Sequence, residues 1–134
     1  MSVSRLAADV AGELRVRDEP VLAAVFAFIE ARYAEPISLA DVARCVGLSP
    51  GHLTTVVGQR TGRTVQRWIA ERRLAEARRL LAATDLTVEA IGARVGYADP
   101  GYFIRVFRRA HGITPLRWRR ADRRPAAPTP APRA

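Results

Sequence analysis

The strongest constraint on this sequence is an internal repeat through its middle and second half. Five positions of the first copy recur 49 positions later: Ser38, Val42, Ala43, Val46 and Gly47 match Thr87, Ile91, Gly92, Val95 and Gly96. Ten further matches, from Ser49 with Asp99 to Trp68 with Trp118, are offset by 50. The change of offset indicates one extra residue in the second turn. The chain therefore uses one supersecondary unit twice.

Each copy contains the start and stop signals of a short helix. A capping residue, Ser38 or Thr87, precedes about two turns of helix with apolar periodicity. Within this helix a small residue, Ala43 or Gly92, allows close approach by another helix. A glycine then follows at the point where a helix ends in a left-handed residue, which glycine adopts without a Cβ clash.

A second helix follows that glycine in both copies. It opens with a cap and a proline at the first helical position, Ser49-Pro50 or Asp99-Pro100. Its predicted buried residues are Leu53, Val56 and Val57 in one copy and Phe103, Val106 and Phe107 in the other. The opposite face is free to enter a DNA major groove. A helix, a glycine turn and a capped helix form the helix-turn-helix pattern, and two copies in register are a much stronger signal than one.

The charge balance points to a polyanionic partner. The chain carries 22 basic residues against 13 acidic ones, a formal net charge of +9, and all the basic residues are arginine. Nucleic acid is the commonest partner of such a chain. Coding bias also explains an arginine-rich, alanine-rich chain, so the positions of the arginines carry more weight than their number.

Other function classes lack their sequence signals. The single cysteine, Cys45, excludes an internal disulfide and a thiolate zinc cluster, and we expect it to be a small buried residue. There is no apolar run of about 18 residues and no secretory signal pattern, so we expect a cytoplasmic location and no membrane partner. No catalytic constellation is visible, so we expect neither an enzyme nor a cofactor or metal.

Residues 96–119, GYADPGYFIRVFRRAHGITPLRWR, resemble the signature segment of AraC/XylS-type transcription regulators. The positions that fit are Gly96, Tyr97, Asp99, Tyr102, Phe103, Arg105, Phe107, Arg108, Arg109, Gly112, Thr114, Pro115, Trp118 and Arg119. The likeness covers roughly residues 20–120. It implies an all-α fold of two homeodomain-like three-helix subdomains, each a helix-turn-helix unit, joined by a long central helix. It also implies sequence-specific binding of double-stranded DNA in two adjacent major grooves, for activation or repression of transcription.

This resemblance and the local signals together predict the domain organisation. Asp18, Glu19 and Pro20 predict a helix start, after a short apolar stripe at Leu6, Val10 and Leu14. We expect a connecting helix or linker over 1–19, a first unit over 20–63, a joining helix over 64–83, a second unit over 84–121 and a disordered basic Pro/Ala tail over 122–134. A joining helix of about 19 residues is ~28 Å long, compatible with the ~34 Å between successive turns of DNA.

The candidates for base contacts lie on the exposed faces of the two recognition helices: Gly51, Thr54 and Thr55 in the first, and Gly101, Ile104 and Arg105 in the second. Arg105 is the best candidate, because a guanidinium can bind guanine O6 and N7 together; pairing with an acid or a phosphate is the alternative. Since the first helix offers small or neutral residues, we expect the first unit to read fewer bases.

The candidates for phosphate contacts are His52, Arg60, Arg63, Arg72, Arg73, Arg108 and Arg109. Pairing with Glu71 or Glu76 is the alternative for some of them. Trp68 and Trp118 are predicted to fill the core.

The expected partner is promoter or operator DNA, with RNA polymerase as a second candidate. We expect a monomer as the isolated domain, or a dimer through a missing effector domain, because nothing here resembles the cupin-like effector domain of many such regulators. The rival interpretation is a helical protein-interaction module that does not bind DNA in a sequence-specific way.

Overall fold

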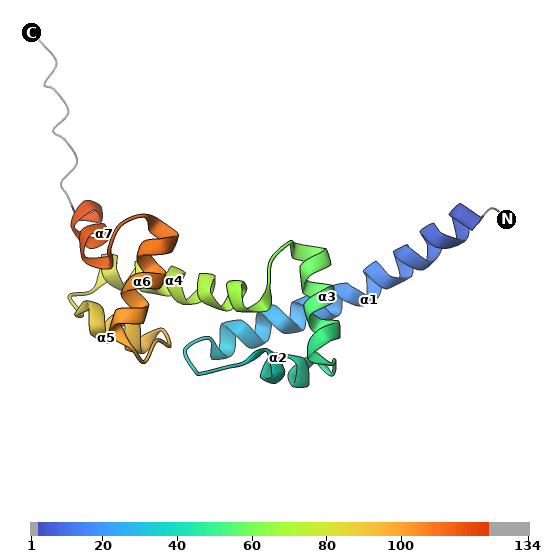
Figure 1. Cartoon of the computed structure of the whole chain (residues 1–134), viewed down its shortest axis with the longest axis horizontal. Coiled ribbons are helices and arrows are strands. Elements are labelled where there is room, and N and C mark those ends of the chain that lie inside the picture. The colour runs from blue at the N-terminus through green and yellow to red at the C-terminus, as the bar shows by residue number, and fades with distance from the viewer. Residues whose placement is uncertain (1–2, 124–134) are drawn as a thin grey trace, which may run out of the picture. The chain divides into compact units, whose positions relative to one another are not determined.

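The computed structural model describes residues 3–123, and side chains from residue 18 onward. This part of the chain forms seven α-helices and no strand, which confirms the predicted all-α class (Figure 1). The helices are α1 (Val3–Arg32), α2 (Leu39–Val46), α3 (Pro50–Thr61), α4 (Val65–Ala83), α5 (Val88–Arg94), α6 (Pro100–His111) and α7 (Pro115–Asp122). The chain divides into two compact units, Met1–Arg73 and Leu74–Ala134, with the division inside α4.

In the first unit, α1, α2, α3 and the start of α4 enclose a small aliphatic core. Its buried members are Val25, Ile29, Val42, Ala43, Leu53, Val57, Val65 and Ile69. Trp68 packs against this core, and its indole N–H donates to Thr61 Oγ1 at 2.9 Å. The ring of Phe26 meets that of Trp68 edge to face, with 5.1 Å between centroids. Trp68 therefore closes the core, as its repeat position predicts.

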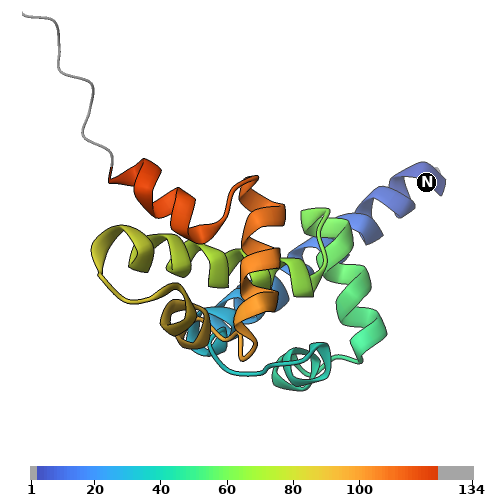
Figure 2. The same cartoon turned by 60° about the vertical axis from the view of Figure 1, so that its left-hand side comes forward.

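The second unit has a larger, more aromatic core between the end of α4 and helices α5 to α7. Its buried members are Leu74, Ala77, Leu80, Leu81, Ile91, Val95, Tyr97, Phe103 and Phe107, and Trp118 packs against them. A Cβ placed on Gly92 would lie only 2.8 Å from Phe103 Cδ2, so glycine is needed for α5 and α6 to approach. Figure 2 shows α7 beside the end of α4, where Arg119 Nε donates to Leu81 O at 3.0 Å.

The helix starts and turns follow the local signals in the sequence. Ser38 Oγ accepts from Asp41 N at 3.2 Å and Thr87 Oγ1 accepts from Ala90 N at 3.1 Å, so both predicted caps are confirmed. The glycine of each turn has a positive φ, 73° at Gly47 and 111° at Gly96. Such angles strain any residue with a Cβ, which explains the repeated glycine.

The extra residue of the second turn is Ala98. Leu48 N donates to Ala43 O at 3.0 Å, and Tyr97 N donates to Gly92 O at 2.8 Å. These two hydrogen bonds are equivalent, so the offset between the copies is still 49 at Leu48 and Tyr97. The caps of the following helices are already 50 positions apart. One residue after Tyr97 therefore accounts for the change of offset.

The structure departs from the sequence prediction at the start of the first unit. Helix α1 continues through Pro20, so the helix start expected at residues 18–20 is absent. Proline removes one i to i−4 hydrogen bond from a helix. The helix continues on both sides of Pro20, where most residues, such as alanine, leucine, arginine and glutamate, have a high helix propensity. The side chains of Leu6, Val10 and Leu14 lie outside the described residues, as does nearly all of the expected tail. No helix among the described residues combines the length and apolar character of a membrane span.

Candidate nucleic-acid interface

Helix α6 has one buried and one exposed face. The side chains of Phe103 and Phe107 are fully buried, while Arg105, Arg108 and Arg109 are exposed and Ile104 is half-buried. Asp99 caps the helix start, where its carboxylate accepts from the backbone N–H groups of residues 101 and 102 at 3.3 and 3.2 Å. The start of α6 is therefore capped, and the polar face of the helix is exposed to solvent.

Arg105 is available for an external ligand. Its guanidinium forms no hydrogen bond or ion pair with any described residue, and its Cζ lies 5.9 Å from the ring centroid of Tyr102. A Cβ on Gly101 would lie 3.7 Å from Arg105 Nη1, so the arginine extends back toward the start of α6. In a helix-turn-helix protein, this N-terminal part of the recognition helix contacts the base edges.

The second unit carries a group of arginines with no ion pair or side-chain hydrogen bond to any residue in the described range. They are Arg94, Arg105, Arg108, Arg109, Arg117 and Arg120. By sequence, this unit has twelve arginines against five acidic residues, a net charge of +7, whereas the first has ten against eight, a net charge of +2. The positive charge of the chain is therefore concentrated in the second unit, where both phosphate candidates of α6 are unpaired.

The exposed face of α3 is neutral. Thr54 Oγ1 donates to Pro50 O at 2.9 Å, and Thr55 Oγ1 donates to Gly51 O at 3.1 Å. These bonds use the hydroxyl protons but leave the methyl groups and oxygen lone pairs available to a base edge. His52 is also exposed. The first unit can thus make apolar and acceptor contacts, but its recognition helix offers no strong cation near its start.

Two of the predicted phosphate residues of α4 are bound within the first unit. Arg72 forms a bidentate pair with Glu30, at 2.5 and 2.9 Å, and its Cζ lies 4.4 Å from the ring centroid of Tyr33. The hydrogen bond from Arg72 lowers the pKa of Glu30. Arg73 donates to the backbone oxygens of Tyr33 and Glu35 at 2.7 and 2.9 Å. Both arginines therefore tie α4 to the end of α1.

The other two arginine candidates of the first unit are also paired. Arg60 contacts Glu19 at 3.0 Å, and Arg63 contacts Glu71 at 2.6 Å while its Cζ lies 5.1 Å from the Trp68 ring. Arg63 therefore uses Glu71, one of the two acids expected to compete for these arginines. Their phosphate contacts remain predictions, because DNA would have to replace or extend these surface pairs.

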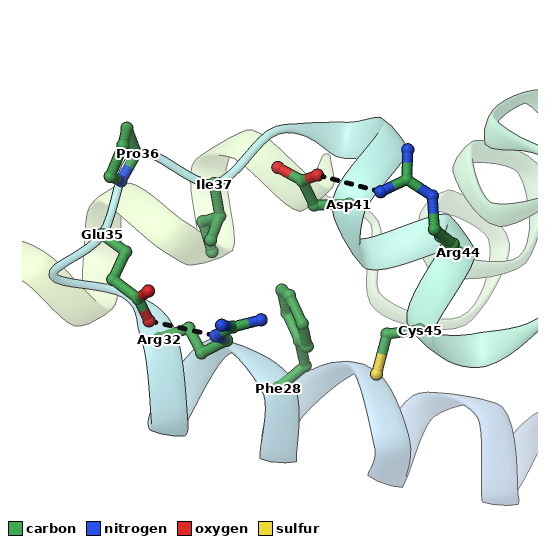
Figure 3. Close-up of a pocket in the computed structure, with 8 residues that line it drawn as sticks. All are labelled: Phe28, Arg32, Glu35, Pro36, Ile37, Asp41, Arg44 and Cys45. Atoms are coloured by element: carbon green, nitrogen blue, oxygen red, sulfur yellow. Dashed lines mark hydrogen bonds and ion pairs between the residues drawn. The ribbon is translucent and has the colours of Figure 1, made fainter.

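A pocket of about 460 Å³ lies in the first unit between α1 and α2 (Figure 3). Its charged residues pair with one another, Arg32 with Glu35 at 3.0 Å and Arg44 with Asp41 at 3.6 Å. Cys45 lines this pocket and is exposed, so the prediction of a buried cysteine is wrong. The reason is that α2 has two turns and buries only the side of Val42 and Ala43.

The sequence reasoning missed Tyr102 as a surface residue of the recognition helix. Its side chain is 51% exposed and lies beside Arg105. The signal that could have revealed it is the spacing, because residues three apart on a helix are neighbours on its surface.

The described residues contain two helix-turn-helix units, and the recognition helix α6 carries three exposed arginines without an ion pair to a described residue. These features define a DNA-binding protein of the tandem helix-turn-helix class. A family model described as a helix-turn-helix domain matches residues 42–121. The chain is 36% identical over 81 residues to the arabinose operon regulatory protein of Salmonella typhimurium, which covers 60% of this chain and 29% of that protein. The chain belongs to the AraC/XylS family of helix-turn-helix transcription regulators, as residues 96–119 led us to expect.

Solved structures of similar domains agree with the fold. An AraC-type regulator from Chromobacterium violaceum has a TM-score of 0.74 at 30% identity, over 83% of this chain and 99% of that one. The DNA-binding domain of AdpA, solved with a target DNA, has a TM-score of 0.72 at 27% identity, over 78% of this chain and 97% of that one. The chain spans less than a third of the length of the curated relatives that it matches most strongly.

Proposed function

We propose that this chain binds promoter or operator DNA in a sequence-specific way, with α3 and α6 in adjacent major grooves, and so positions a transcription regulator. The observation that carries the proposal is the exposed face of α6, where Arg105, Arg108 and Arg109 have no ion pair or side-chain hydrogen bond with a described residue. Unpaired guanidinium groups on a recognition helix match the negative charge of phosphates and the acceptors of guanine.

The exposed residues have different roles in this proposal. Arg105 binds a base, because it lies in the first half of α6, whereas Arg108 and Arg109 neutralise phosphates. In the first unit, Gly51, Thr54 and Thr55 approach base edges closely and without charge. The second unit therefore supplies most of the affinity and most of the sequence discrimination, and the first unit reads fewer bases.

At the level of the whole regulator, we propose a monomeric DNA-binding domain, with dimerisation through a separate effector domain and with RNA polymerase as the protein partner. The greater length of the curated relatives supports such a division of labour. Promoter binding would take place in the cytoplasm.

Salt dependence separates DNA binding from the rival function of protein docking. We expect the chain to bind a random-sequence duplex of about two helical turns, with log K falling by about 0.9 per phosphate contact for each unit of log salt. The double variant Arg108→Ala/Arg109→Ala should reduce this slope by about 2. A chain that binds no duplex at low salt, or whose binding ignores salt, would support the protein-interaction module.

A further inference from the structure

The most exposed large apolar side chain in the described part of the molecule lies on the recognition helix of the second unit. Tyr102 is 51% exposed, compared with 44% for Leu116 and 38% for Phe26. An aromatic ring in such a position interacts weakly with water and is typical of a contact surface. Its position on α6 places it on the surface assigned to DNA.

The ring of Tyr102 is supported from behind. It meets the ring of Tyr97 at a centroid distance of 5.8 Å and an interplanar angle of 65°. Tyr97 is buried and lies 5.5 Å from the ring of Phe103, in the core. The backbone N–H of Tyr102 donates to the capping carboxylate of Asp99 at 3.2 Å. Because the ring already has a fixed support, little rotamer entropy is lost when its other side contacts a ligand.

The same ring borders the guanidinium of Arg105. The Arg105 Cζ lies 5.9 Å from the ring centroid of Tyr102, and the absence of a side chain at Gly101 leaves room for this arrangement. An apolar ring and a fork of N–H donors thus lie side by side near the start of α6. Residues three apart on a helix have Cβ atoms about 5–6 Å apart, so the two side chains can reach neighbouring base pairs, which are ~3.4 Å apart.

We propose that Tyr102 contacts the 5-methyl group of a thymine next to the guanine that Arg105 binds. The thymine methyl group is the apolar feature of the major-groove surface, and guanine offers the two acceptors that suit a guanidinium. The preferred site of the second unit therefore contains a guanine and a thymine in adjacent base pairs. This inference rests on the DNA-binding function proposed above and adds to it a second specificity-determining residue.

The first unit lacks this pair of residues. The repeat places His52 where the second unit has Tyr102, and Thr55 where it has Arg105. Behind them, Leu48 occupies the position of Tyr97. Recognition of the guanine and thymine pair is therefore a property of the second unit alone.

The test uses duplexes selected by the wild-type chain from a random pool. In the best duplex, the thymine beside the guanine is replaced by deoxyuridine, which removes only the methyl group. We expect wild type to bind the uracil duplex about fourfold more weakly, as for the loss of one buried methyl group. Tyr102→Ala should bind both duplexes equally, whereas Tyr102→Phe should keep the preference. Leu116→Ala removes another exposed apolar side chain of this unit and is the matched control. It should also keep the preference for the thymine duplex.

Each contrary result has a definite meaning. Equal binding of the two duplexes by wild type overturns the inference, and so does an enriched site without an adjacent guanine and thymine. If Tyr102→Ala folds and keeps the full preference for the thymine duplex, another residue contacts the methyl group and the inference is wrong. If the pool yields no enriched sequence, the proposed function itself fails. Equal binding by wild type would overturn the inference even if Tyr102→Ala does not fold.

Discussion

Arg73 and Arg123, 50 positions apart in the sequence, form the same contact in their respective units. Arg73 Nη2 donates to the backbone oxygen of Glu35, just past the end of α1, at 2.9 Å. Arg123 Nη2 donates to the backbone oxygen of Thr84, just past the end of α4. Each arginine donates to backbone carbonyl groups at or just beyond the C-terminal end of a helix, where a cationic side chain is favourable. The repeat thus extends to a structural arginine in each unit.

This contact predicts a stability role for Arg73. Arg73→Ala should lower the free energy of unfolding of the first unit by about 1–2 kcal/mol, because hydrogen bonds from a charged donor are lost at a half-buried site. Thermal or urea unfolding measures the change, and Arg67→Ala is the matched control, since Arg67 is exposed and has no ion pair with a described residue. Unchanged stability together with a lower salt slope of DNA binding would instead make Arg73 a phosphate contact.

Gly92, within a helix of the second unit, has no room for a Cβ atom, whereas Gly58, within a helix of the first unit, has room for one. Gly92→Ala should destabilise the second unit by about 1–3 kcal/mol, because the new Cβ would lie 2.8 Å from a buried phenylalanine ring. Gly58→Ala is the control, since nothing lies within 4 Å of its Cβ position, and it should stabilise α3 by up to about 1 kcal/mol. Equal effects of the two substitutions on the unfolding midpoint would contradict the packing described for α5 and α6.

Base and phosphate contacts on α6 should separate in binding measurements. Arg105→Ala should lose about 1–3 kcal/mol of discrimination between selected and random duplexes, with a smaller loss of affinity for random DNA. Arg108→Ala should weaken both duplexes alike and reduce the salt slope by about 1. If Arg105→Ala weakened both duplexes equally, Arg105 would be a phosphate contact.

The first unit should lose stability in acid through two carboxylates. The pKa of Glu30 is lowered by its hydrogen bond from Arg72, and that of Asp41 by hydrogen bonds from the backbone and side chain of Ser38. Both pKa values lie below the ordinary values of 4.5 for Glu30 and 3.8 for Asp41. Each carboxylate therefore contributes its full stabilisation above its ordinary pKa, and this stabilisation is lost as the pH falls through the lowered pKa. Unfolding midpoints between neutral and acid pH should converge for wild type, Glu30→Gln and Asp41→Asn. A constant gap would refute this linkage.

Short-range signals in the sequence predicted most of the fold. The cap at Ser38, the glycine at position 47 and the proline at position 50 each act on residues no more than about four positions away. Their physical effect is therefore readable from the sequence alone. The continuation of α1 through Pro20 could not be predicted from the sequence, because a proline is compatible both with a first helical turn and with the interior of a helix that lacks one hydrogen bond.

The surface chemistry was less accessible to sequence reasoning. Arg72 pairs with Glu30, 42 positions earlier, so its partner becomes known only when α1 and α4 are in contact. The exposure of Arg105 was predictable, because its place on α6, opposite two buried phenylalanines, follows from helical periodicity.

The most direct test of the account is the sequence logo of duplexes that the wild-type chain selects from a random pool. We predict two short preferred segments in one duplex, with centres roughly one helical turn, about 10 base pairs, apart and with the stronger preference under the second unit. A pool without enrichment, or with a single preferred segment, would contradict recognition by two helix-turn-helix units.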